Sequence, residues 1–117
     1  MRKRRSALLV ILLVTVAASG TALTQSFNTA GRAVYGAGNN SCAQWTDARD
    51  HDTWATAGQW VLGFVSATAM YSRVSPAKTD ARSIANWIDK YCLAHSGSDL
   101  SDGARELVEL LLSGTAP

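Results

Sequence analysis

The 117-residue sequence is poor in the residues that build catalytic and metal centres. It has only two cysteines, which form no CxxC motif, and only two histidines, so that it offers no zinc-ligand spacing. It also has no nucleophile elbow, and its glycine-rich stretch at 36–38 follows no predicted strand and lacks a phosphate-loop pattern. We therefore expect no enzyme, with no catalytic residue, no metal and no cofactor.

Strand patterns and helix breakers are scarce as well. No segment alternates apolar and polar residues over the length of a strand, and the chain contains only two prolines. These absences predict an all-α protein, a small bundle of three or four helices without repeats or a second domain.

The N-terminal segment has the pattern of a secretory signal peptide, which we place at residues 1–22. Four basic residues at 2–5 precede an apolar run over 7–18, and small residues follow at the expected cleavage positions. The run of about 12 residues is shorter than the roughly 20 that span a bilayer, so an uncleaved inner-membrane anchor is the less favoured alternative. The expected location is the periplasm, reached by Sec-type export.

Removal of this segment changes the charge of the chain. The precursor carries a formal charge of +2, with eleven basic and nine acidic residues. Four of the basic residues lie in the signal, so the remaining chain has seven against nine, a net charge of −2. The basic residues are therefore an export feature, and we expect no nucleic-acid partner and no membrane contact after cleavage.

The rest of the chain divides into an arm, a helical domain and a short tail. Residues 23–40 are rich in Gly, Asn, Ser and Thr, which predicts a flexible arm. The helical domain is expected over 41–113, followed by a disordered tail at 114–117.

Apolar spacings of three and four residues locate the helices inside this domain. Ser41 can cap a first helix over 42–49. The long apolar run that follows predicts the central helix, and Thr79 or Asp80 can cap a third helix. The stripes are Trp54, Ala57, Val61, Phe64, Val65 and Thr68 for the central helix, Ile84, Trp87, Ile88 and Tyr91 for the third, and Leu100, Ala104, Leu107, Val108 and Leu111 for a fourth.

Cys42 and Cys92 predict one structural disulfide. An even pair of cysteines behind an export signal indicates an oxidising compartment. Closing a loop of about 50 residues should stabilise the fold by roughly 4 kcal/mol on the chain-entropy description. The bond would clamp the first and third helices across the central one.

Two groups in the central helix are candidate contact sites. Gly63 and Ala67, with Phe64 between them, give a small-xxx-small face, which predicts close packing inside the bundle or against a second subunit. Trp54 and Trp60 lie six positions apart and cannot both point into one narrow stripe. They are core residues in the simplest interpretation, and candidate partner-binding aromatics in the other.

One polar cluster could carry chemistry. Asp47, Asp50, His51 and Asp52 bring carboxylates within a helical turn of an imidazole, an arrangement that could bind a metal or act as a base. A solvated helix end explains the same residues without further partners.

The helical domain resembles the periplasmic acid-stress chaperones of the HdeA/HdeB type. The resemblance rests on residues 41–45 (SCAQW), 60–64 (WVLGF) and 84–92 (IANWIDKYC). It implies a small helical protein, often dimeric, with one disulfide between early and late helices. The implied partners are unfolded client proteins, bound when the periplasm turns acid.

The C-terminal part is also similar to the Rap1a/Tai immunity proteins, through residues 91–95 (YCLAH) and 104–108 (ARELV). That resemblance implies a periplasmic helical protein that binds one cognate secreted toxin. The expected function is thus a small non-enzymatic protein-binding protein, an HdeA-like envelope-stress chaperone or, as the alternative, an immunity protein; a minor structural or assembly factor of the envelope is a third interpretation.

Overall fold

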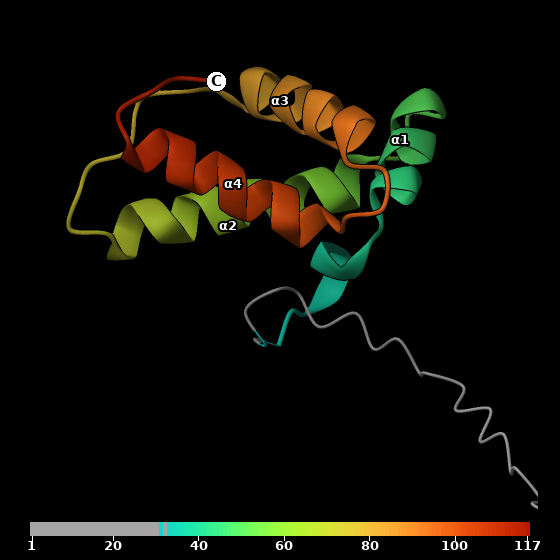
Figure 1. Cartoon of the computed structure of the whole chain (residues 1–117), viewed down its shortest axis with the longest axis horizontal. Helices are drawn as coiled ribbons and strands as arrows, with labels where there is room; N and C mark the ends of the chain where they lie inside the picture. The colour runs from blue at the N-terminus through green and yellow to red at the C-terminus, as the bar shows by residue number, and fades with distance from the viewer. Residues whose placement is uncertain (1–30, 32) are drawn as a thin grey trace, which may run out of the picture.

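The computed structural model describes residue 31 and residues 33–117. The predicted signal peptide at 1–22 and half of the predicted arm, residues 23–30 and 32, lie outside the described residues. Within the described part, four α-helices and one turn of 3-10 helix form the structure, and no strand is present (Figure 1). The predicted all-α fold is confirmed.

The helices follow one another with short connections. They are the 3-10 turn η1 (Gly36–Asn39), α1 (Cys42–Asp50), α2 (Ala55–Tyr71), α3 (Ala81–Ala94) and α4 (Leu100–Leu112). A pair of residues in β-bridge geometry, Ser41 and Asp99, ties the start of α1 to the start of α4.

The centre of the bundle is α4, and the prediction that residues 54–68 form the central helix is wrong in this respect. Helix α4 lies between α2 and α3 (Figure 1) and contacts both, together with η1. Its buried residues are Leu100, Ser101, Gly103, Ala104, Leu107, Val108 and Leu111. Helix α2 buries only Ala57, Gly58 and Val61 of its 17 residues. Helix α2 is therefore uncharged along its whole length, but it does not lie at the centre of the bundle.

Local capping determines where α1 and α3 begin. The Ser41 hydroxyl accepts a hydrogen bond from the Gln44 N–H (3.2 Å), and the Gln44 side chain accepts one from the Ser41 N–H (2.8 Å). This reciprocal pair is a capping box. The Asp80 carboxylate accepts from the Ser83 N–H at 2.8 Å. The predicted cap Ser41 is confirmed, and of the two alternatives Thr79 and Asp80 for the third helix, the structure has Asp80.

Helix α1 ends in a tight left-handed turn. Asp52 has a φ of 54°, and the N–H of Thr53 donates to the carbonyl of Ala48 at 2.8 Å. This is the hydrogen bond of a Schellman motif, with aspartate in the left-handed position that glycine more often occupies. The turn fixes the direction in which the chain enters α2.

The last part of the predicted arm is ordered against the bundle. Residues 36–39 form η1, which contacts α2 and α4. The backbone of Gly38 lies against the indole ring of Trp60, so that a Cβ atom at this position would overlap the ring. The Trp60 Nε1 donates to the Tyr35 carbonyl at 2.8 Å. A flexible arm as far as residue 40 therefore does not describe residues 36–39.

Candidate functional site

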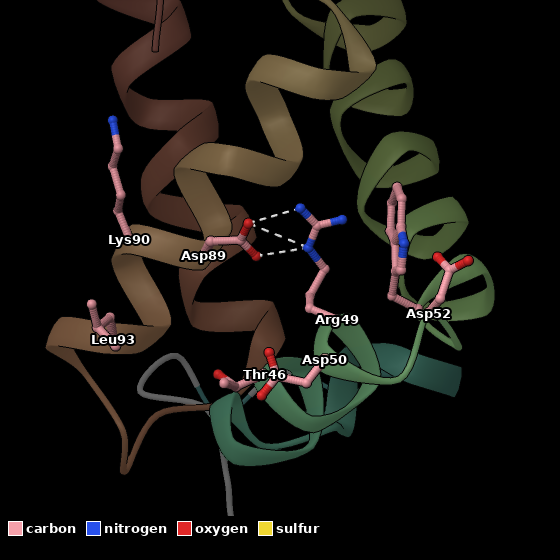
Figure 2. A pocket seen from close by; sticks show the side chains of 8 residues that line it. Thr46, Arg49, Asp50, Asp52, Asp89, Lys90 and Leu93 are labelled. Carbon is pink, nitrogen blue, oxygen red and sulfur yellow. Dashed lines mark hydrogen bonds and ion pairs between the residues drawn. The ribbon is translucent and has the colours of Figure 1, made fainter.

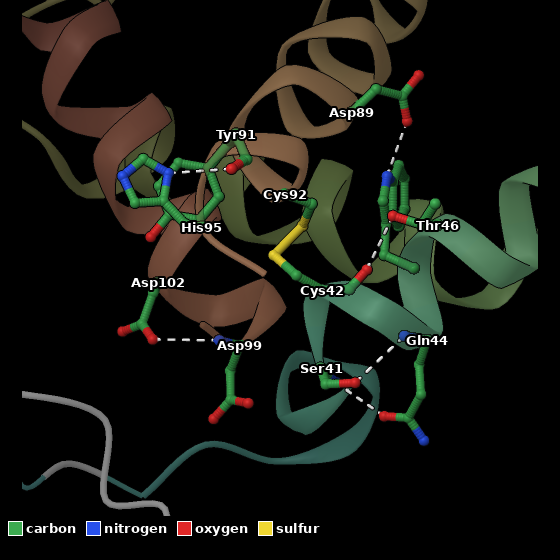
Figure 3. Close-up of a disulfide and its surroundings, with 11 residues drawn as sticks. Ser41, Cys42, Gln44, Thr46, Asp89, Tyr91, Cys92, His95, Asp99 and Asp102 are labelled. Atoms are coloured by element: carbon green, nitrogen blue, oxygen red, sulfur yellow. Dashed lines mark hydrogen bonds between the residues drawn. A yellow bond between two sulfur atoms is a disulfide. The ribbon is translucent and has the colours of Figure 1, made fainter. Parts of the chain in front are cut away.

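A disulfide joins the first residue of α1 to the last turn of α3. The Cys42 and Cys92 sulfur atoms are bonded (Figure 3), with a Cα–Cα distance of 4.8 Å, and both residues are buried. The predicted disulfide is confirmed. Helix α1 packs directly on α3, so the prediction that the bond reaches across the central helix is wrong.

Asp89 forms a second connection between α1 and α3. Its Oδ1 accepts hydrogen bonds from the Trp45 indole Nε1 at 2.8 Å and from Arg49 Nε at 3.0 Å, and its Oδ2 accepts from Arg49 Nη2 at 2.9 Å. Figure 2 shows the guanidinium and the carboxylate facing each other between the two helices. A bidentate pair of this kind fixes orientation as well as distance.

The Arg49 guanidinium also contacts two indole rings. Its Cζ lies 4.5 Å from the centroid of Trp54 and 5.9 Å from that of Trp45. The two rings meet edge to face, with centroids 6.0 Å apart. These cation–π and aromatic contacts hold the end of α1 and the start of α2 around a single cation.

A hollow of about 460 Å³ opens beside this cluster (Figure 2). Helix α1 and its C-terminal turn provide one wall and α3 the other. The lining residues are Thr46, Arg49, Asp50, Asp52, Trp54, Asp89, Lys90 and Leu93. Trp54, a predicted partner-binding aromatic, therefore lies at a hollow, whereas Trp60 is partly buried beneath η1 and stacks on Phe64 with a centroid distance of 5.4 Å.

The outer face of α2 is a second candidate surface. None of the residues of Ala55–Tyr71 carries a charge. Near its C-terminal end, Met70 is 76% exposed and Tyr71 is 86% exposed. A shallow groove of about 400 Å³ lies alongside, lined by Phe64, Ala67, Thr68, Tyr71 and Ser72. Large exposed apolar side chains gathered next to a groove are typical of a protein-binding surface. We refer to these residues, with Met70, as the α2 face.

The predicted contact residues Gly63, Phe64 and Ala67 do not share one environment. Gly63 is exposed, and a Cβ atom there would meet nothing within 4 Å, so close packing inside the bundle is wrong for this residue. Ala67 is also exposed, whereas Phe64 is partly buried against the core. Packing of Gly63 and Ala67 against a second subunit stays a prediction.

Sequence reasoning missed Met70, Tyr71 and Leu93 as surface residues. Leu93 is 82% exposed although it follows the buried Cys92. Its position is off the apolar stripe of α3, which could have identified it as an outward residue. For Met70 and Tyr71, the complete absence of charge from α2 could have indicated an exposed apolar surface.

Two carboxyl groups and one imidazole have shifted pKa values, and burial also raises the pKa of the Tyr91 phenol. Burial, with the nearby Asp102 carboxylate, raises the pKa of Asp99. The hydrogen bond from the Ser83 N–H lowers the pKa of Asp80. The hydrogen bond to the Asp47 carbonyl, with the charge of the Asp47 carboxylate, raises the pKa of His51. At the start of α4 the Asp102 carboxylate points toward the backbone of Asp99 (Figure 3) and accepts from the Asp99 N–H at 3.3 Å.

The polar cluster at the end of α1 forms no metal centre. Among residues 31 and 33–117, no three metal-ligating side chains come together. His51 instead pairs with Asp47, with 3.3 Å between Nδ1 and Oδ1, on the exposed face of α1. Across the same residues, no helix has the length and apolar character required to cross a membrane.

Comparison with known proteins gives no relative. No family model matches the chain, and neither the curated proteins nor the solved structures include a significant match.

Proposed function

We propose that this chain is a small exported, non-enzymatic protein that binds other proteins through the α2 face. One observation carries the proposal. Helix α2 has 17 residues without a charge, buries three of them, and leaves Met70 and Tyr71 exposed at its end. Water-facing helices normally present a charged or strongly polar face, so an uncharged exposed helix is better explained by a partner that covers it.

The chemistry of the α2 face suits partners of varied sequence. Met70 is unbranched and polarizable, and such side chains adapt to differently shaped apolar surfaces. The neighbouring groove is lined mainly by carbon, with no charged group that would fix one orientation. Binding without charge pairing discriminates weakly among apolar segments, which is the property needed to hold unfolded clients.

We further propose that the clients are envelope proteins damaged by acid, as the resemblance to the HdeA/HdeB type implies, and that the location is the periplasm. Protonation of nine carboxylates and two histidines would take the chain without its signal from −2 to about +9. That charge loosens packing through self-repulsion. The disulfide keeps α1 on α3, so loosening is expected to free α2 first and to enlarge the apolar surface.

The test is suppression of aggregation by the exported, oxidised protein. Full-length chain is expressed with its own N-terminal segment and purified from the periplasm, and its mass identifies the cleavage site. Alcohol dehydrogenase is then unfolded below about pH 4, where carboxylates titrate. The protein is expected to keep the client soluble, and the Met70→Gln/Tyr71→Gln variant is expected to lose most of this effect.

Leu93→Gln is the matched control, because it removes one exposed apolar side chain from a different surface. It should suppress aggregation as the wild type does. Absence of suppression by the wild type would reject the chaperone function, and equal loss in both variants would reject the α2 face as its site.

A second copy of the chain is the simplest alternative occupant of the α2 face. Two uncharged helices can meet without like-charge repulsion, and exposed Gly63 and Ala67 allow a close approach. Sedimentation at neutral pH tests this homodimer: Gly63→Leu should convert a dimer to a monomer without unfolding it.

The second candidate function is binding of one cognate protein, in the manner of the Rap1a/Tai immunity proteins. The observation that favours it is the double connection of α1 to α3 by the disulfide and by Asp89. A surface preorganised in this way suits one complementary partner.

A further inference from the structure

A continuous groove follows the line along which α1 meets α3. Two hollows, of about 460 and 410 Å³, lie along this line and share Thr46, Asp50 and Leu93. The first hollow extends to Trp54, and the second extends past the disulfide to Ser96. We call this surface the α1–α3 groove.

The groove combines an apolar centre with an acidic rim. Leu93, 82% exposed, belongs to both hollows and therefore stands at the middle of the groove. The lining residues include four carboxylates, those of Asp47, Asp50, Asp52 and Asp89, and only two cations. Arg49 and Asp89 neutralise each other in their ion pair. Three carboxylates thus remain against the single ammonium group of Lys90, and the imidazole of His51, 3.3 Å from Asp47, is the one further titratable group that contacts them.

The rim is held in place before any partner arrives. Both walls are connected by the disulfide and by the Arg49–Asp89 pair (Figures 2 and 3). The Schellman turn fixes Asp52 relative to Asp50 at the end of α1. A partner therefore has to order only the side chains of these carboxylates, and not the backbone that carries them.

We propose that the α1–α3 groove binds a segment of a partner protein in which lysine or arginine side chains flank an apolar residue. The apolar residue packs on Leu93, and the cations face Asp47, Asp50 and Asp52. Charge complementarity selects this occupant, because an acidic segment would meet like charge along the rim. The inference rests on the second candidate function, whose partner chemistry it specifies, and it makes no use of the α2 face.

The test uses a short fluorescein-labelled peptide that alternates lysine with leucine, with fluorescence anisotropy as the readout. The groove variant is Asp50→Asn/Asp52→Asn, since both side chains are exposed and asparagine tolerates the left-handed backbone of Asp52. Its charge-matched control is Glu106→Gln/Glu109→Gln on α4. The groove variant should weaken binding by about fivefold, as expected for two solvent-exposed charge pairs, and the control should change it by less than about twofold.

A second variant, Leu93→Gln, tests the apolar centre and should also weaken peptide binding. The Met70→Gln/Tyr71→Gln variant should bind the peptide as the wild type does. Equal weakening by the two charge doubles would show that only net charge attracts the peptide, and would overturn the proposal. Absence of peptide binding, or its loss in the α2 variant alone, would also overturn it, while leaving aggregation suppression through the α2 face untouched.

Discussion

Arg49 and Asp89, 40 residues apart in the sequence, form a bidentate ion pair that holds the end of α1 on the middle of α3. The disulfide holds the beginning of α1 on the last turn of α3. A nine-residue helix is too short to be stable alone in water, so these two attachments and its caps stabilise it. They also determine the shape of the α1–α3 groove.

Replacement of Asp89 by asparagine should lower the free energy of unfolding by about 1 to 2 kcal/mol. The change removes the charge that pairs with Arg49, whose side chain is only 26% exposed. Urea denaturation of the oxidised protein measures the loss. Asp50→Asn, an exposed change on the same groove, should alter stability by less than about 0.5 kcal/mol. Equal effects of the two substitutions would show that the ion pair contributes no stability.

Loss of the disulfide should have a larger effect. Cys42→Ala/Cys92→Ala opens a loop with a sequence separation of 50 residues, and the chain-entropy description gives a cost of about 4 kcal/mol. Thermal and urea unfolding of the variant and the wild type measure it. A cost below about 1 kcal/mol would mean that α1 is held on α3 mainly by its noncovalent contacts.

Two glycines should respond in opposite directions to replacement by alanine. Gly38→Ala places a Cβ atom into the Trp60 ring and should destabilise the protein by about 1 to 3 kcal/mol. Gly63→Ala adds a Cβ to an open position on α2 and should stabilise it by up to about 1 kcal/mol. Thermal unfolding followed by circular dichroism compares the two. Destabilisation by Gly63→Ala would indicate that this position packs against something, as a buried dimer interface would require.

Asp99 and Asp80, whose pKa values are shifted in opposite directions, should affect stability in opposite ways as the pH changes. The pKa of Asp99 is raised in the folded state. Its contribution to the free energy of unfolding is therefore fully present below the unfolded-state pKa and is lost as the pH rises through the folded-state pKa. Asp99→Asn does not titrate and keeps a good N-cap residue. It should therefore be more stable than the wild type at pH 7, by less than about 1 kcal/mol, and lose this advantage below about pH 4.

Asp80 provides the comparison. The pKa of Asp80 is lowered in the folded state. Its contribution to the free energy of unfolding is therefore present above the unfolded-state pKa and is lost as the pH falls through the folded-state pKa. Asp80→Asn should be less stable than the wild type at neutral pH, with a difference that disappears in acid. Denaturation across the pH range measures both variants, and parallel trends would contradict the assignment.

Local sequence patterns were sufficient to predict the all-α fold, the cap of α1, and the cap of α3 to within one residue. Ser41 and Asp80 act on backbone groups three residues away, so short-range chemistry determines their role. The disulfide was predictable because the chain has no other cysteine with which either could pair.

Long-range packing explains what could not be predicted. The Arg49–Asp89 pair depends on the way α1 crosses α3, which no local pattern encodes. Residues 36–39 are ordered because Trp60 offers a flat surface to Gly38, a contact that composition alone does not indicate. A glycine within a helix suggested close packing at Gly63, but the neighbouring helices of the bundle lie elsewhere.

Photo-cross-linking from α2 measures directly whether this helix contacts the client. A photoreactive amino acid replaces Tyr71 in one preparation and Glu109, on α4, in another, and each is illuminated with acid-unfolded alcohol dehydrogenase. Strong cross-links are expected from position 71 and weak ones from position 109. Cross-links of equal strength from both positions, or none from position 71, would contradict binding through the α2 face.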